Sequence, residues 1–186
     1  MTGHTDDHVR GIAVSKRDHA RGSARAAILL VEYGDYECSE SGAAYRTITE
    51  AQRELGTQLR FVFRNFPLRK IHPHAFAASV ATEAAALQGK FWEMHDTVFE
   101  NQKTLDDEHI LFFASQLGLD IESFKNDTQQ KQLTDKVEKD FESGLRSGVN
   151  KTPTFFINGE KYEGEWWDGN FMQYAQSILT GMPKAY

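Results

Sequence analysis

The chain has 186 residues, with 21 lysines and arginines against 27 aspartates and glutamates, so its net charge is −6 with histidine neutral. At 40% hydrophobic and 26% charged residues, its composition is typical of one folded globular domain, or of a small fold that carries an insertion. The acidic balance argues against nucleic-acid binding through general phosphate attraction. The longest apolar run, residues 26–31, is too short to cross a bilayer.

The first third of the chain predicts a β-α-β unit preceded by a polar arm. Residues 1–25 are polar and show no periodicity, and they lack the apolar segment of a secretory signal, so a cytoplasmic location is expected. The apolar residues 26–33 predict a buried strand. Residues 36–55 predict a helix that Gly56 ends, and residues 59–66 predict a second strand. A right-handed crossover makes these two strands parallel neighbours.

The rest of the chain predicts a run of helices and then a β-β-α unit. Helices are expected over 74–88, 91–101, 107–117 and 130–147, with a short turn at 121–127. Residues 152–159 predict a strand followed by a turn, in which the Asn158–Gly159 pair is a hairpin signal, and residues 161–163 predict the return strand. A last helix is expected at 168–179. The fold class is therefore α/β with a mixed sheet, and the closing hairpin excludes an open Rossmann pattern.

The single cysteine, Cys38, lies where the first predicted helix begins. One cysteine excludes an intramolecular disulfide and a cysteine-rich metal site. Helix N-termini have unpaired N–H groups and partial positive charge, which stabilise a thiolate and make it a nucleophile. A lone cysteine is more often a small buried apolar residue, but the polar neighbours Asp35, Glu37, Ser39 and Glu40 favour an exposed helix start.

Residues 31–42, VEYGDYECSESG, resemble the active-site segment of DsbA-like thioredoxin-fold proteins, which usually reads C-P-x-C. Further matches follow in the same order, at FVFRNFPL (61–68), HPHA (72–75), GKFWEMH (89–95) and GVNKTPTFFING (148–159). The resemblance covers nearly everything from residue 18 to the end. It implies a thioredoxin-like mixed β-sheet over 26–67 and 148–186, with a helical subdomain inserted at 68–147 and the arm of 1–25 in front.

The chain departs from this family at the motif itself. Ser39 stands where the family usually has proline, and Ser41 where it has the second cysteine. Without that sulfur the chain cannot form its own disulfide and pass it on by exchange. We expect Ser41 to cap the helix or to donate a hydrogen bond to the thiolate. The carboxylate of Glu40 opposes the helix start in stabilising the thiolate of Cys38, and the sequence leaves open which effect prevails.

Thr152 and Pro153 form the second expected element of the site. The resemblance implies that their peptide bond is cis and lies beside the cysteine. The backbone of Thr152 would then be free to hydrogen-bond an extended substrate as an added strand. Trp166 and Trp167 either line a peptide groove or pack into the core, and packing is favoured.

His72 and His74 flank a proline, but no further ligand stands at metal spacing, so no metal is expected. His74 is expected to open the alanine-rich helix instead. The mixed charges over 131–142 are expected to be the solvated face of a helix. Ser39 and Ser41 lack the surroundings of a serine nucleophile.

The leading hypothesis is a DsbA-like thiol–disulfide oxidoreductase that works with one thiol. Cys38 and Ser41 would be catalytic, and Thr152 and Pro153 would bind the substrate, a protein or glutathione disulfide. Glutathione would serve as resolving co-substrate, with no other cofactor, no metal, no nucleic acid and no membrane insertion. Two alternatives stay open: a thioredoxin-fold module that binds a partner without catalysis, and a glutathione-dependent transferase or isomerase.

Overall fold

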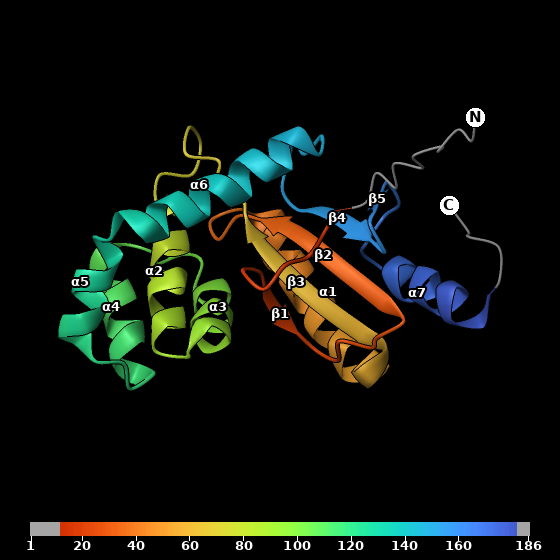
Figure 1. Ribbon diagram of the computed structural model, residues 1–186, viewed down its shortest axis with the longest axis horizontal. Coiled ribbons are helices and arrows are strands. Elements are labelled where there is room, and N and C mark those ends of the chain that lie inside the picture. The colour runs from red at the N-terminus through yellow and green to blue at the C-terminus, as the bar shows by residue number, and fades with distance from the viewer. Residues whose placement is uncertain (1–11, 182–186) are drawn as a thin grey trace, which may run out of the picture.

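The computed structural model describes residues 12–181 and centres on one mixed β-sheet (Figure 1). The strand order is β1-β3-β2-β4-β5; β2 and β3 are parallel and every other pair is antiparallel. The strands are β1 (His19–Arg21), β2 (Ile28–Gly34), β3 (Leu59–Asn65), β4 (Thr154–Ile157) and β5 (Glu160–Tyr162). The expected α/β class, the parallel pair and the closing hairpin are confirmed.

The helices are α1 (Ser39–Leu55), α2 (Ala75–Leu87), α3 (Phe91–Glu100), α4 (Asp107–Gln116), α5 (Ile121–Thr128), α6 (Lys131–Arg146) and α7 (Asn170–Thr180), with a 3-10 turn at Gly56–Gln58. Between β3 and β4, α2 to α5 gather to one side of the sheet, and α6 runs from that group back toward it (Figure 1). The turn expected at 121–127 is wrong. It is helix α5, because the Asp120 carboxylate accepts a hydrogen bond from Ser123 N at 2.7 Å and caps the helix start.

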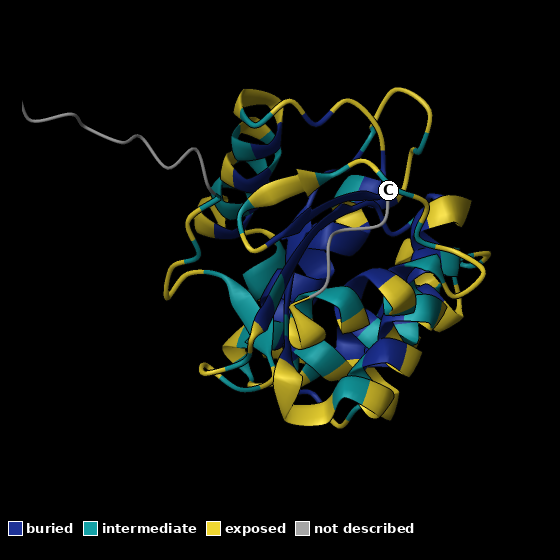
Figure 2. Cartoon of the chain, turned by 90° about the vertical axis from the view of Figure 1, so that its right-hand side faces the viewer, coloured by how far each residue is buried: buried dark blue, intermediate teal, exposed yellow. Residues whose placement is uncertain are grey.

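The central strands β2, β3 and β4 are buried on both faces of the sheet, as the dark strands of Figure 2 show, whereas the edge strands β1 and β5 are partly or largely exposed. Successive side chains of a strand point to opposite faces. Leu30 of β2 and Phe63 of β3 belong to the core shared with α1 and α3, whereas Val31 and Val62 belong to the core that Phe141 of α6 packs against. The central strand β2 therefore has little freedom to shift, and it delivers the following residues to a fixed place.

Part of the N-terminal arm expected over residues 1–25 is a strand, β1, so that expectation is wrong for His19–Arg21. Residues 1–11 of the expected arm lie outside the described residues. β1 pairs antiparallel with β3, with His19 opposite Phe63. Its polar side chains have partners on the inserted helices: His19 Nε2 lies 2.8 Å from Glu83 Oε2, and Arg21 pairs with Asp96 at 2.9 Å. A polar sequence becomes a strand here because tertiary partners satisfy its side chains.

Candidate active site around Cys38

Cys38 is the N-cap residue of α1 and lies just beyond the end of β2. Its backbone is extended (φ −76°, ψ 122°), and its amide donates to Asp35 O at 3.1 Å, which closes a turn over residues 35–38. Its thiol is free. The sulfur therefore lies at the N-terminal end of a helix of 17 residues, where the partial charge of the helix dipole is positive.

The Thr152–Pro153 bond is cis, and it faces the cysteine. Cys38 Sγ lies 3.3 Å from Thr152 O, so the thiol donates a hydrogen bond to that carbonyl. Both expectations for this segment, the cis bond and the contact with the cysteine, are confirmed. The Thr152 hydroxyl is buried and has no hydrogen-bond partner.

The expected exposure of Cys38 is wrong, since only 7% of the residue is accessible. Ser39 and Glu40 are exposed as the polar pattern suggested, but Asp35 is completely buried. The segment at Thr152 and the side chain of Gln102 lie over the turn. Residues from far along the chain thus cover a helix start that its own neighbours would leave open.

Ser41 does not have either expected contact in the structure. The helix cap is Cys38 itself, without a side-chain cap hydrogen bond, and Ser41 is the third residue of α1. Its hydroxyl is buried and accepts a hydrogen bond from Asp35 N at 3.3 Å. Ser41 therefore braces the turn that precedes the cysteine and has no hydrogen bond to the sulfur.

Gln102 clamps the same turn from the inserted helical layer. Its Nε2 donates to Tyr36 O at 2.8 Å and to Cys38 O at 2.9 Å. The clamp needs Gly42, because a Cβ at that position would lie 1.9 Å from Gln102 Oε1. Sequence reasoning missed Gln102, and no local pattern marks it; the glycine at 42 within a helix was the available signal.

Two histidine–carboxylate pairs tie the turn to the loop that leads into α2. The buried carboxylate of Asp35 accepts hydrogen bonds from Glu37 N at 2.8 Å and Leu68 N at 2.7 Å, and it lies 2.8 Å from His72 Nδ1. Glu37 accepts from His74 N at 2.7 Å and lies 3.0 Å from His74 Nδ1. Burial opposes ionisation of Glu37, but the hydrogen bonds from His74 outweigh it and hold the pKa of that carboxyl below its ordinary value.

These histidines are structural in this arrangement. His74 is the N-cap residue of α2, as expected. Within residues 12–181 no group of three or more histidine, cysteine, aspartate or glutamate side chains could hold a metal ion. The two pairs connect the Cys38 turn to α2 and give the turn a fixed shape.

Glu32, which sequence reasoning did not single out, is a buried carboxyl group in the middle of β2. It is 1% exposed, and its Oε1 has no hydrogen-bond partner. Burial raises the pKa of Glu32 to about 8. A Cβ on Gly34 would lie 2.8 Å from Oε1, so the glycine makes room for the carboxyl group. The signal was the one acidic residue within an otherwise apolar strand.

Two hollows flank the site. The first, the tryptophan hollow, measures about 540 Å³ and is bordered by Ser39, Glu40 and Arg46 of α1 together with Trp166 and Trp167. Trp166 packs edge-on against Phe155 of the core, as favoured, but Trp167 is 45% exposed. The tryptophan pair thus both packs and borders a groove that begins one residue from Cys38.

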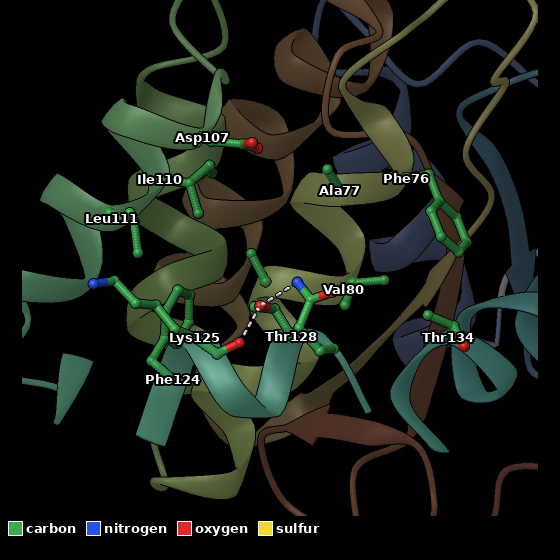
Figure 3. Close-up of a pocket in the computed structure, with 12 residues that line it drawn as sticks. Phe76, Ala77, Val80, Asp107, Ile110, Leu111, Phe124, Lys125, Thr128 and Thr134 are labelled. Atoms are coloured by element: carbon green, nitrogen blue, oxygen red, sulfur yellow. Dashed lines mark hydrogen bonds between the residues drawn. The ribbon is translucent and has the colours of Figure 1, made fainter. Parts of the chain in front are cut away.

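The second, the apolar hollow, measures about 500 Å³. It is lined by Pro67, Leu68, Arg69, Lys70, Ile71, Glu138, Phe141 and Asn150. A third hollow of about 360 Å³ lies among the inserted helices, where Phe76, Ile110 and Phe124 form apolar walls and Lys125 lies near its rim (Figure 3). None of the residues that line this third hollow forms a hydrogen bond with Cys38, and none of them is a cysteine.

The structure has a thioredoxin-like fold: a mixed sheet is interrupted by helices, and a cysteine at the start of a helix lies opposite a cis-proline at the start of a strand. The family comparison agrees over most of the chain. Residues 14–172 match the family described as thioredoxin, and the chain belongs to that family.

Solved structures share this fold. A thioredoxin-like oxidoreductase from Silicibacter pomeroyi superposes with a TM-score of 0.78 at 21% identity, over 91% of this chain and 95% of that one. Oxidised BdbD from Bacillus subtilis gives 0.77 at 21% identity, over 89% and 95%. Alpha-DsbA1 from Wolbachia pipientis gives 0.78 at 18% identity, over 90% and 94%.

The relatives with higher sequence identity are named as Na(+)/H(+) antiporters and not as oxidoreductases. The chain is 41% identical over 153 residues to Na(+)/H(+) antiporter NhaA 1 from Mycobacterium sp. (strain KMS), which is 81% of this chain and 25% of that protein. It is 38% identical over 169 residues to Na(+)/H(+) antiporter NhaA 3 from Salinispora tropica, or 91% of this chain and 25% of that one. The chain spans about a quarter of the length of these curated relatives. Between residues 12 and 181, the structure has no helix with the length and apolarity that a membrane crossing requires.

Proposed function

We propose that this chain exchanges disulfides through one thiol, that of Cys38. The observation that carries the proposal is the placement of Cys38 Sγ at the start of α1, 3.3 Å from the carbonyl of Thr152. The thiol first loses its proton to solvent. The thiolate then attacks one sulfur of a substrate disulfide, so that a Cys38–substrate disulfide forms, the substrate S–S bond breaks, and the departing sulfur keeps the electron pair.

The second half of the cycle needs a thiol from outside the chain, because Ser41 offers no sulfur. Glutathione, or another small thiol, attacks the substrate sulfur of the mixed disulfide as its thiolate. A glutathione–substrate disulfide forms, the Cys38–substrate bond breaks, and Cys38 leaves as a thiolate with the electron pair. The backbone at Thr152 would hold the substrate as an added extended strand. In this role Ser41 acts through the turn that it braces.

The test is exchange between the chain and a peptide–glutathione mixed disulfide, followed in the presence of reduced glutathione. The unmodified chain should accelerate the exchange above the rate of glutathione alone, and Cys38→Ser should return it to that rate. Exchange that survives in Cys38→Ser would remove the thiol from the mechanism. A matched serine control is Ser39→Ala, which alters an exposed neighbour of the cysteine and leaves the sulfur in place.

A second candidate is a partner-binding module, which the antiporter relatives favour. They share 41% identity with this chain over a quarter of their length, and the site lacks its second sulfur. In this case the chain would work beside a Na(+)/H(+) antiporter and alter its transport without turnover. Sodium-driven proton movement in membrane vesicles, measured with and without the chain, should then change equally for the unmodified chain and for Cys38→Ser. A thiol role predicts that only the unmodified chain has an effect.

A further inference from the structure

The apolar hollow is joined to the Cys38 site along both of the segments that build it. On one side, Asp35 Oδ2 accepts a hydrogen bond from Leu68 N at 2.7 Å, while Asp35 O accepts one from Cys38 N. On the other side, Asn150 lines the hollow and precedes Thr152 by two residues. Two residues of extended chain span at most about 7 Å, so the hollow begins within that reach of the carbonyl that contacts the sulfur.

The interior of this hollow is apolar and open to solvent. Pro67 and Phe141 form part of its wall, and Ile71, at its border, is 68% exposed. Among the large apolar residues of the range 12–181, Ile71 is the most exposed. An apolar surface of this kind is stabilised when an apolar partner covers it, by about 25 cal/mol per Å² of area removed from water.

The charged groups around the hollow divide into paired and unpaired ones. Arg69 is engaged, because it forms an ion pair with Glu138 and lies over the ring of Phe76 at 3.4 Å. Lys70, which lines the hollow, and Lys151, which follows Asn150, have no carboxylate partner among the described residues. The free charge at this border is positive, although the chain as a whole carries −6.

We propose that the apolar hollow receives an apolar side chain of the polypeptide segment whose cysteine reacts with Cys38, and that Lys70 and Lys151 attract an acidic residue of the same segment. An extended segment rises about 3.3 Å per residue. The distance from Thr152 to Asn150 therefore places the apolar side chain about two residues from the reacting cysteine. The proposal rests on the disulfide exchange proposed above and names the class of substrate: a protein with an apolar and acidic sequence around its disulfide.

The test uses short cysteine peptides activated as mixed disulfides with thionitrobenzoate. The Cys38 thiolate attacks the peptide sulfur, the Cys38–peptide disulfide forms, and thionitrobenzoate leaves with the electron pair and is read by its absorbance. One peptide has leucines near the cysteine and aspartates at its ends. A second has serines for the leucines, and a third has lysines for the aspartates. The mixed disulfide of thionitrobenzoate with a small thiol reports the intrinsic reactivity of Cys38.

The leucine–aspartate peptide should react about tenfold faster than the serine peptide, which corresponds to about 1.4 kcal/mol of apolar contact. Ile71→Ser should remove that preference and leave the small disulfide unaffected. The matched control is Leu145→Ser, since Leu145 is 53% exposed on α6 and does not line the hollow. Lys70→Glu should slow the aspartate peptide about fivefold in dilute salt and less in concentrated salt, whereas Arg25→Glu, before β2, should not.

The outcomes separate this proposal from the proposed function. If neither peptides nor the small disulfide react, the exchange function fails, and the hollow is then tested by fluorescence anisotropy of the labelled peptides with Cys38→Ser, where the same order of affinities is expected. Equal rates or affinities for the leucine and serine peptides would refute the proposed role of the apolar hollow in substrate binding. So would a dimer in sedimentation that Ile71→Ser dissociates, because the hollow would then belong to a second copy of the chain.

Discussion

Replacing Glu32 by glutamine should change how the stability of the protein depends on pH. Burial raises the pKa of Glu32 to about 8, against an ordinary value of 4.5. Below pH 4.5 the carboxyl group is protonated in both the folded and the unfolded chain. As the pH rises, the unfolded chain releases the proton while the folded chain keeps it, so stability is lost progressively until the folded pKa is reached.

The size of the effect follows from the two pKa values. Their difference is 8 − 4.5 = 3.5 units, and at about 1.36 kcal/mol per unit the loss is about 5 kcal/mol. Between pH 5 and pH 7 alone, the loss is about 2.5 kcal/mol. That is a large part of the stability of an ordinary domain. Glutamine does not ionise, so Glu32→Gln should lack this loss and gain on the unmodified chain as the pH rises.

Urea unfolding at several pH values between 5 and 8, followed by tryptophan fluorescence, measures the difference. A matched control is Glu83→Gln. Burial opposes ionisation of Glu83, but His19 and Lys136 outweigh it and lower the pKa of that carboxyl. Its stabilisation is present above the unfolded pKa and is lost as the pH falls, which is the opposite sign. A free-energy difference between Glu32→Gln and the unmodified chain that stays constant from pH 5 to pH 8 would refute the reasoning.

Four other changes act on the Cys38 turn. Gln102→Ala should cost about 1–3 kcal/mol of stability, because two carbonyls lose a hydrogen bond, and should raise the alkylation rate of Cys38 by iodoacetamide. Gly42→Ala should have a similar effect, since its Cβ displaces Gln102. In the Gln102→Ala background, Gly42→Ala should instead stabilise α1 by about 1 kcal/mol. Additive changes of the two substitutions in the free energy of unfolding by urea would contradict the proposed contact between Gln102 and the turn. Ser41→Cys should allow a disulfide with Cys38, because residues three apart on a helix are neighbours, and should give insulin reduction by dithiothreitol; a disulfide without that gain would favour the binding module. Ser41→Ala should slow exchange less than about tenfold, because the Ser41 hydroxyl contacts Asp35 N and not the sulfur.

Most helices and strands of the fold were predictable because a local sequence pattern specifies each of them. The apolar run at 26–33, the glycine that ends the first helix, and the Asn158–Gly159 pair predicted β2, the end of α1 and the final hairpin within one to two residues or so of their observed bounds. Strand periodicity and turn chemistry act over a few residues, so the sequence carries them directly. The position of Cys38 at a helix start was predictable for the same reason.

The sequence failed where residues far apart in the chain decide the outcome. β1 is a strand because Glu83 and Asp96 on the inserted helices satisfy its polar side chains. Cys38 is buried because Thr152 and Gln102 lie over it, although its own neighbours are polar. Burial and hydrogen bonding depend on which surfaces meet, and no local pattern records that.

The sequence by itself determined that one thiol stands at the start of the first helix and that a second sulfur is missing from position 41. It also determined the order of the strands and helices other than β1 and α5, since these follow from periodicity and turn residues. Only the tertiary structure decided that the sulfur faces the Thr152 carbonyl, that Gln102 clamps its turn, and that Glu32 is buried with Oε1 lacking a hydrogen-bond partner. The reason is physical: the reactivity and access of a side chain are set by the dielectric and the partners around it, and in this protein those partners come from segments more than 60 residues away.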